Sequence, residues 1–366
     1  MKKLGFGFMR LPKLENGQVD LEHTKQMVDA YMAAGFTYFD TAHNYIGGQS
    51  ETALRECLTS RYPRESYVLT DKLTRLYFEE EADIRPVLDL ELEILGVDYL
   101  DYLLLHAVGS GSYEKLTRCN AFGQMQKFKE DGKCRHIGMS FHDTPEFLEK
   151  VLTEHPEIEI VQIQFNYLDV ENPEVQSRGV YEVCRKFGKD VLVMEPVKGG
   201  NLANLPESVA KVFVEANPEV SQSSWAIRYA ASLPGLVTVL SGMSNIEQMD
   251  DNLKTMTNFQ PLTDAERAVI AKAVEAMDAI ERIPCTKCQY CVKDCPQQIN
   301  IPGIFSTMND LSVYGNLAAA KGSYNWATKD KGKASDCLAC GQCESACPQH
   351  INIIEQLKTI AGKLEG

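Results

Sequence analysis

The chain has 366 residues, of which 44% are hydrophobic and 24% charged, as in ordinary globular proteins. This length suits one large domain followed by a smaller one. The formal net charge of −14 argues against a nucleic-acid or anionic-membrane partner, because both require a basic face. With no apolar run near the ~18 residues of a membrane span and no signal-peptide pattern, a cytoplasmic location is predicted.

Residues 1–262 alternate short apolar runs, typical of strands, with longer amphipathic runs, typical of helices. Because each parallel strand pair needs a crossover of about a dozen residues, the pattern predicts an α/β fold of the (β/α)8 TIM-barrel type. A doubly wound fold would carry G-x-G-x-x-G after the first strand, and residues 5–10 lack it. The expected strands are 4–9, 38–42, 67–73, 102–107, 136–141, 161–166, 191–196 and 237–242, and the expected helices include 23–35, 84–96 and 145–155.

Polar side chains follow three successive expected strands: Asp40 and Tyr45 the second, Lys72 the third and His106 the fourth. Barrel enzymes place their catalytic residues at this rim. An ammonium group stabilises a nearby phenolate and so lowers the tyrosine pKa, ordinarily near 10, while a carboxylate can hold the ammonium in place. An imidazole can orient a carbonyl oxygen. Each residue alone is more often a helix cap or a solvated tip, but the four together indicate an acid–base site.

A helix is expected at Thr263–Arg282, opened by Thr263 and Glu266 in capping-box register and ended by Pro284. The expected domains are therefore a barrel at 1–262, a connecting helix at 263–283 and a small, mainly helical domain at 284–366. This tail repeats itself, since residues 285–301 and 337–353 share four cysteines, Pro-Gln and Ile-Asn-Ile. The stretch between the two copies is long enough to hold helices of its own.

Each copy carries the spacing C-x2-C-x2-C-x3-C-P, which is typical of two-cluster ferredoxins. In such proteins three close cysteines bind one [4Fe-4S] cluster and the fourth serves the other cluster. Zinc is the alternative, but zinc sites usually use two pairs of ligands. Cys57, Cys119, Cys134 and Cys184 lack such spacing and are expected to be ordinary thiols. The two predicted ligand sets are Cys285, Cys288, Cys291 with Cys347, and Cys337, Cys340, Cys343 with Cys295.

Residues 1–262 resemble the aldo/keto reductase superfamily, whose tetrad is Asp, Tyr, Lys and His in this order. The resemblance rests on the segment 40–45, the following Ser50-Glu51, Lys72 and the LLLH sequence that ends at His106. With the cysteine tail, the whole chain resembles the bacterial and archaeal branch that carries a C-terminal ferredoxin-type domain with two [4Fe-4S] clusters.

The resemblance implies a role for each tetrad residue. Tyr45 would be the general acid, Lys72 would tune it, Asp40 would hold Lys72 and His106 would orient the substrate. NAD(P)H would be the hydride donor.

It also implies cofactor contacts. Ser140 and Gln162 match the residues that bind the carboxamide, although Phe141 replaces the usual Asn after the serine, and Met194 stands where the family commonly stacks an aromatic ring on the nicotinamide. Gln248 stands where other members bind the 2'-phosphate with Arg, so a strong preference for NADPH is not expected. A plain helix start is the alternative for this segment. The adenosine-side candidates are Gly242, Ser244, Gln248, Asp251 and Asn252, the aspartate replacing a family glutamate.

The predicted function is NAD(P)H-linked interconversion of a small-molecule carbonyl and its alcohol. The alternative is an iron–sulfur electron-transfer protein whose barrel is a docking or flavin-binding scaffold. A complete tetrad favours the enzyme. Hydride transfer moves two electrons and a cluster moves one, so redox-active clusters would need a flavin, a radical step, or a ferredoxin or flavoprotein partner. Structural clusters would need none, and the sequence leaves this choice open.

Overall fold

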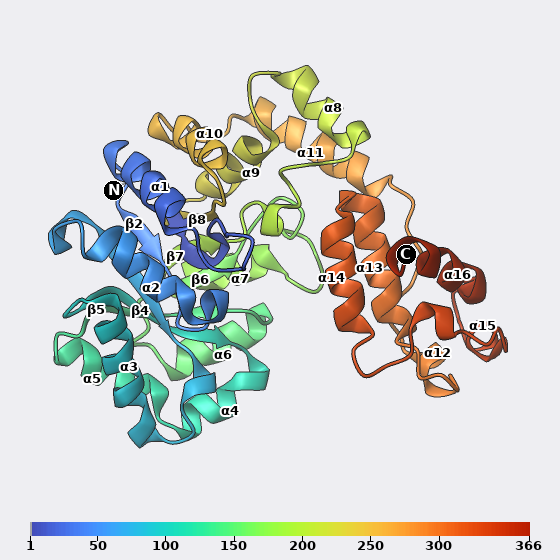
Figure 1. Ribbon diagram of the computed structural model, residues 1–366, viewed down its shortest axis with the longest axis horizontal. Helices are drawn as coiled ribbons and strands as arrows, with labels where there is room; N and C mark the ends of the chain where they lie inside the picture. The colour runs from blue at the N-terminus through green and yellow to red at the C-terminus, as the bar shows by residue number, and fades with distance from the viewer. Residues whose placement is uncertain (1) are drawn as a thin grey trace. The chain divides into compact units, whose positions relative to one another are not determined.

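The computed structural model describes residues 2–366, which form two compact units. Residues 2–199 and 223–267 make up the barrel unit, and residues 200–222 and 268–366 make up the cysteine unit. The chain runs from blue to red in Figure 1. None of the helices in this described part combines the length and apolarity that crossing a bilayer demands.

The barrel unit contains eight parallel strands that pair in chain order, and β8 pairs with β1 to close the ring. This arrangement confirms the predicted (β/α)8 barrel. The strands are β1 (Leu4–Gly7), β2 (Tyr38–Asp40), β3 (Val68–Leu73), β4 (Leu100–Val108), β5 (Cys134–Phe141), β6 (Ile160–Gln164), β7 (Asp190–Met194) and β8 (Leu236–Gly242).

Helices cover the outside of the barrel (Figure 1). Their apolar faces pack on the outward-facing strand residues and form the main hydrophobic core. These helices are α1 (Leu21–Ala33), α2 (Gln49–Leu54), α3 (Glu81–Leu95), α4 (Ser110–Arg118), α5 (Ala121–Glu130), α6 (Pro145–Glu154), α7 (Ser177–Lys186), α9 (Gln222–Ala231) and α10 (Ile246–Thr257).

A separate apolar cluster fills the barrel interior. It is formed by Tyr38, Leu104, Ile160, Leu192 and Leu240. Successive strand residues face opposite sides, so their neighbours in sequence pack outward. Since apolar side chains occupy the middle of the barrel, polar side chains gather at the carboxyl ends of the strands.

Helix α11 (Asp264–Asp278) begins as predicted. The Thr263 amide donates to Glu266 at 2.8 Å and the Glu266 amide donates to Thr263 at 3.3 Å, which is the expected capping box. The predicted end at Arg282 is wrong, because the helix stops at Asp278. The Met277 carbonyl at the helix end accepts from the Ile280 amide at 3.2 Å and also from the Arg282 guanidinium, which turns back to it at 2.8 Å.

The cysteine unit is built from short helices. Two of them lie between the cysteine motifs, as predicted for that long stretch. Its core contains the Ile-Asn-Ile isoleucines of both repeats, Ile299 and Ile301 from the first and Ile351 and Ile353 from the second. The helices are α8 (Glu207–Ala216), α12 (Tyr290–Lys293), α13 (Ile301–Tyr314), α14 (Leu317–Ala327), α15 (Gln342–Ser345) and α16 (Ile353–Leu364).

The sequence repeat is also a repeat of backbone conformation. Positive φ angles occur in pairs at positions that correspond in the two copies. Because only a few residue types adopt such angles without strain, their recurrence indicates that both copies fold into the same loop. The pairs are Lys287 and Ala339, Gln289 and Gly341, and Gln298 and His350.

Candidate active site and cysteine pockets

The four predicted tetrad residues lie together at the carboxyl ends of β2, β3 and β4. The Lys72 ammonium donates to the Asp40 carboxylate at 2.6 Å and to the Thr41 carbonyl at 2.7 Å. It also lies 4.8 Å from the centre of the Tyr45 ring. The Tyr45 and His106 rings meet edge to face, with their centres 5.7 Å apart. The sequence spacing therefore predicted a real cluster of side chains.

Local backbone features aim these side chains. The β4–β5 pairing shifts its register between Leu105 and Val108, and Ala107 has a φ of 54°. Such a bulge at a strand end redirects the adjoining side chain, here that of His106. After Tyr45, Ile46 and Gly47 adopt left-handed conformations, which turn the chain into α2.

Burial dominates the electrostatics of the site. It raises the pKa of Asp40 and of Tyr45, while the nearby Lys72 ammonium acts on both in the opposite direction. Lys72 lowers the pKa of Tyr45, as expected, but desolvation is the larger effect, so the net pKa of Tyr45 lies above its ordinary value. For Lys72, burial lowers the pKa, but Asp40 and Tyr45 outweigh it and the net shift is upward.

Burial and the neighbouring Lys72 lower the pKa of His106 to about 3. The imidazole is therefore neutral near pH 7, with one N–H and one acceptor nitrogen. Its Nδ1 lies 2.7 Å from the Thr74 hydroxyl.

Ser140 and Gln162, the predicted carboxamide contacts, lie on β5 and β6 close to the tetrad. The Gln162 amide donates to Asp40 at 3.3 Å, and the Ala107 amide donates to the Ser140 hydroxyl at 2.8 Å. Among the described residues, the buried side-chain oxygen of Gln162 has no hydrogen-bond partner. A buried acceptor without a donor is unusual and fits a bound group that carries an N–H.

The remaining cofactor candidates lie at the ends of β7 and β8. Met194 ends β7, and Gly242 ends β8. The side-chain oxygen of Gln248 accepts from the Ser244 amide at 2.8 Å, and the Ser244 hydroxyl donates to the Arg10 carbonyl at 2.7 Å. Gln248 thus holds the loop before α10, where the free N–H groups of a helix start can bind an anion.

Three of the adenosine-side candidates lie on α10, namely Gln248, Asp251 and Asn252. Asn252 is buried and donates to the Ser241 hydroxyl of β8 at 2.8 Å, so its amide already has a partner within the fold. Asp251 is half-buried.

Sequence reasoning missed several residues near the site. Thr41 and Thr74 bond to Lys72 and His106, and His142 directly follows β5 on the same rim. Arg10, just after β1, packs against Gly242. A search for polar side chains just after each expected strand could have found His142 and Arg10. The threonines carried no signal, since one acts through its backbone carbonyl and both are common strand-end residues.

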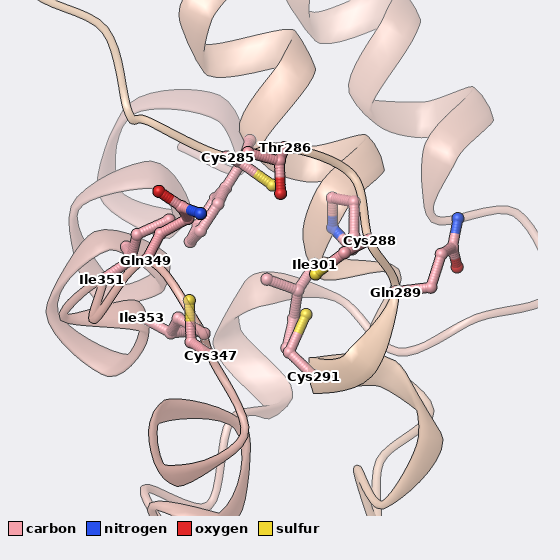
Figure 2. A pocket seen from close by; sticks show the side chains of 12 residues that line it. Cys285, Thr286, Cys288, Gln289, Cys291, Ile301, Cys347, Gln349, Ile351 and Ile353 are labelled. Atoms are coloured by element: carbon pink, nitrogen blue, oxygen red, sulfur yellow. The ribbon is translucent and has the colours of Figure 1, made fainter.

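In the cysteine unit, the eight motif cysteines line two pockets. Cys285, Cys288 and Cys291 share the first pocket with Cys347, and Figure 2 shows their sulfur atoms facing a common space. The second pocket is lined by Cys337, Cys340, Cys343 and Cys295.

Each pocket therefore combines three cysteines of one repeat with the fourth cysteine of the other. Burial and neighbouring thiols raise the pKa of Cys291 and of Cys343 to about 11. Four thiolates can then share a pocket only when a cation compensates their charge, so the donor set fits a metal centre. The other four cysteines belong to the barrel unit, where they are buried and form no disulfide. They are Cys57, Cys119, Cys134 and Cys184.

Residues 3–275 match the model of the aldo/keto reductase family, and residues 284–352 match that of the 4Fe-4S dicluster domain. The chain is similar to an L-galactose dehydrogenase of Arabidopsis thaliana, with 26% identity over 248 residues that cover 62% of this chain and 76% of the relative. It is also similar to an NADH-specific methylglyoxal reductase of Escherichia coli, with 22% identity over 309 residues that cover 72% of this chain and 91% of the relative.

Two solved structures share the fold. An aldo-keto reductase of Bacillus halodurans in its holo form has a TM-score of 0.61 and 24% identity, over 75% of this chain and 92% of that one. An aldo-keto reductase of Klebsiella pneumoniae in complex with NADPH has a TM-score of 0.60 and 18% identity, over 74% of this chain and 90% of that one.

A closed barrel with this rim is an oxidoreductase barrel, and the chain belongs to the aldo/keto reductase family. Within that family it carries, in addition, a C-terminal 4Fe-4S dicluster domain of the ferredoxin type.

Replacing Lys72 with Met should destabilise the protein by about 3–5 kcal/mol, because the buried Asp40 carboxylate would lose its counter-ion. The double variant Lys72→Met/Asp40→Asn should recover part of that loss, since it leaves no unpaired charge. Denaturant unfolding under anaerobic conditions, followed by circular dichroism, measures both. If the double variant is no more stable than Lys72→Met, the unpaired Asp40 charge is not the cause of the lost stability.

Proposed function

We propose that the protein catalyses NAD(P)H-linked reduction of an aldehyde or ketone, or the reverse oxidation, with Tyr45 as the general acid. The observation that carries the proposal is the contact of Lys72 with both Asp40 and the Tyr45 ring, with the His106 ring edge to face with that of Tyr45. These groups surround one point at the rim where a carbonyl oxygen would lie.

The tyrosine hydroxyl donates a proton to the carbonyl oxygen as negative charge develops there. The Lys72 ammonium, held by Asp40 and the Thr41 carbonyl, stabilises the phenolate that this transfer leaves. In the tautomer of the neutral His106 that we propose, Nδ1 accepts from the Thr74 hydroxyl, so that the N–H on Nε2 can orient the carbonyl oxygen. The raised pKa of Tyr45 keeps the acid protonated near pH 7.

NAD(P)H supplies the hydride when bound. Gln162 would accept from the carboxamide N–H through its unpaired oxygen, and the Ser140 hydroxyl, which already accepts from Ala107, would donate to the carboxamide oxygen. The start of α10 would hold the adenosine side, with the basic side chain of Arg10 beside Gly242. Because Gln248 is neutral and holds the Ser244 amide, we expect Arg10 rather than Gln248 to decide the preference between NADH and NADPH.

The proposed substrate is a small, polar carbonyl compound. The names of two similar proteins mention methylglyoxal and L-galactose, both of which are small and rich in oxygen. A panel of short aldehydes and aldoses is therefore the first screen, with product measured by chromatography because iron–sulfur absorption overlaps that of NADH.

Tyr45→Phe should lower kcat by at least ~100-fold, the lower range of general-acid contributions, while the affinity for the cofactor changes little. Tyr181→Phe is the matched control, because its hydroxyl bonds only to the Pro234 carbonyl at the barrel surface. We expect the control to keep wild-type turnover. Near-normal turnover in Tyr45→Phe would contradict the assignment of the proton donor.

The pH dependence of kcat/KM for reduction should show no ionisation near 6.5. His106 titrates only near pH 3, so it stays neutral throughout the neutral range. Activity should fall only as the pH rises through the pKa of Tyr45, which lies above the ordinary value of about 10. A steady-state profile from pH 5 to 9 should thus be flat, and an acidic limb near pH 6–7 that disappears in His106→Gln would refute the neutral imidazole.

We further propose that the tail binds two [4Fe-4S] clusters with crossed ligands, as the cysteine spacing predicts. The composition of the two pockets supports this. Cys288 and Cys340, one ligand of each set, are exposed, so an external ferredoxin or flavoprotein could approach both clusters. We infer that the clusters exchange single electrons with such a partner. The domain boundaries expected from the sequence, 1–262, 263–283 and 284–366, stay a prediction.

Crossed ligation is tested by pairs of Cys→Ser substitutions. The intact protein should hold about eight iron and eight sulfide per chain in anaerobic preparations. Cys295→Ser with Cys340→Ser removes two ligands of one proposed set, so about four iron should remain. Cys295→Ser with Cys288→Ser damages both sets, so little iron should remain.

If the ligation is not crossed, Cys288 and Cys295 share one cluster. The variant Cys295→Ser with Cys288→Ser would then keep about four iron. Cys184→Ser, in a buried barrel thiol, is the control and should keep full iron content. Stoichiometric zinc in place of iron would end the cluster proposal.

A further inference from the structure

A group of buried acidic side chains lies on the outer side of the barrel, between β3 and the helices α2 and α3. Glu51 comes from α2, Asp71 from β3 and Glu91 from α3, and all three are fully buried. Asp71 directly precedes Lys72, so the two side chains point to opposite faces of the strand. The proposed catalytic tetrad uses none of the three.

One histidine completes the group. The Nδ1 atom of His43, in the loop after β2, lies 2.7 Å from the Glu51 carboxylate. Candidate ligand atoms of His43, Glu51 and Glu91 all lie within 4.8 Å of one another. His43 itself is partly exposed, with 17% of its side chain accessible, so a small ion could reach the group from that side.

The carboxyl groups lack the partners that burial requires. Within residues 2–366, neither side-chain oxygen of the fully buried Glu91 has a hydrogen-bond partner. One oxygen each of Glu51 and Asp71 meets no N–H or hydroxyl donor, and these two carboxyl groups lie within hydrogen-bonding reach of each other. Burial raises the pKa of Glu51 to about 7 and the pKa values of Asp71 and Glu91 well above their ordinary range. Buried carboxyl groups are normally paired or coordinate a metal.

We propose that His43, Glu51 and Glu91 bind a divalent transition-metal ion of the Zn²⁺ type, with Asp71 as a neighbour of Glu51 outside the ligand set. Bonds of about 2.0–2.2 Å from nitrogen and oxygen would place the ligand atoms roughly 3–4 Å apart, so the three side chains need to move together only slightly. An imidazole with carboxylates suits zinc or iron better than Mg²⁺ or Ca²⁺, which prefer oxygen ligands alone.

This ion would be separate from the proposed clusters, because no cysteine belongs to its ligand set. It would join the loop that precedes Tyr45 to α2 and to α3. Its expected role is to hold these segments together, since its three protein ligands come from three separate segments of the chain.

Zinc binding to the full-length protein with intact clusters tests the proposal. The protein is dialysed anaerobically against buffered Zn²⁺, and zinc and iron are both measured by mass spectrometry. One zinc per chain should bind while the iron content stays constant, which shows that zinc has not replaced iron at the cysteines. The zinc X-ray absorption spectrum should show nitrogen and oxygen near 2.0–2.1 Å and no sulfur near 2.3 Å.

Glu91→Gln and His43→Asn should each weaken zinc binding by more than ~100-fold, beyond the usual effect of losing an outer-shell partner. The matched controls are Glu159→Gln and His136→Asn, which alter a more exposed histidine–glutamate pair with the same 2.7 Å separation and should bind zinc as the wild type does. Zinc should also raise the unfolding temperature of the wild type but not of Glu91→Gln.

Three outcomes would overturn the proposal. The first is absence of bound zinc, which means that the carboxyl groups hold protons instead. The second is equal zinc binding by the wild type and the Glu91→Gln protein. The third is a zinc spectrum dominated by sulfur.

Discussion

The buried ion pair of Lys72 with Asp40 constrains the rest of the barrel rim. An ammonium group that is 1% exposed is tolerated only beside an opposite charge, and the carboxylate lies 2.6 Å away on the neighbouring strand β2. The two strands must therefore pair in one register, which puts Asp40 beside Thr70, two residues before Lys72. The Thr41 carbonyl and the Gln162 amide complete the hydrogen bonds of the pair.

The remaining rim geometry follows from this pair. The loop after Asp40 returns Tyr45 over the ammonium, and the irregular end of β4 brings the His106 ring into edge-to-face contact with the tyrosine ring. Both Tyr45 and His106 are consequently in a desolvated space, where burial keeps the phenol protonated and the imidazole neutral. Tyr45 and His106 can thus donate hydrogen bonds and a proton while both are neutral. The charge of Lys72 is compensated by Asp40.

Much of this could be predicted from the sequence, for reasons that differ between the two units. The alternation of apolar and amphipathic runs predicted the barrel because each strand and each helix has its own period. The two sets of cysteines that line the pockets match the ferredoxin-type spacing, because in that pattern the fourth cysteine serves the other set. The end of α11 at Asp278 was not predicted, since the sequence signal for a helix end, Pro284, lies six residues farther along. The acidic group of Glu51, Asp71 and Glu91 was also missed, because its members lie far apart in sequence and meet only through packing.

The crossing of the cysteine sets also fixes the order in which they are completed during synthesis. The chain emerges from its amino end, so the set that begins at Cys285 stays open until Cys347 has been made, whereas the later set is already complete at Cys343. In the proposed ligation, neither cluster is fully bound until cysteines of both copies of the motif have been synthesised. A chain released between Cys343 and Cys347 would carry one complete set and three unmatched thiols, so a shortened product would be exposed to oxidation at Cys285, Cys288 and Cys291.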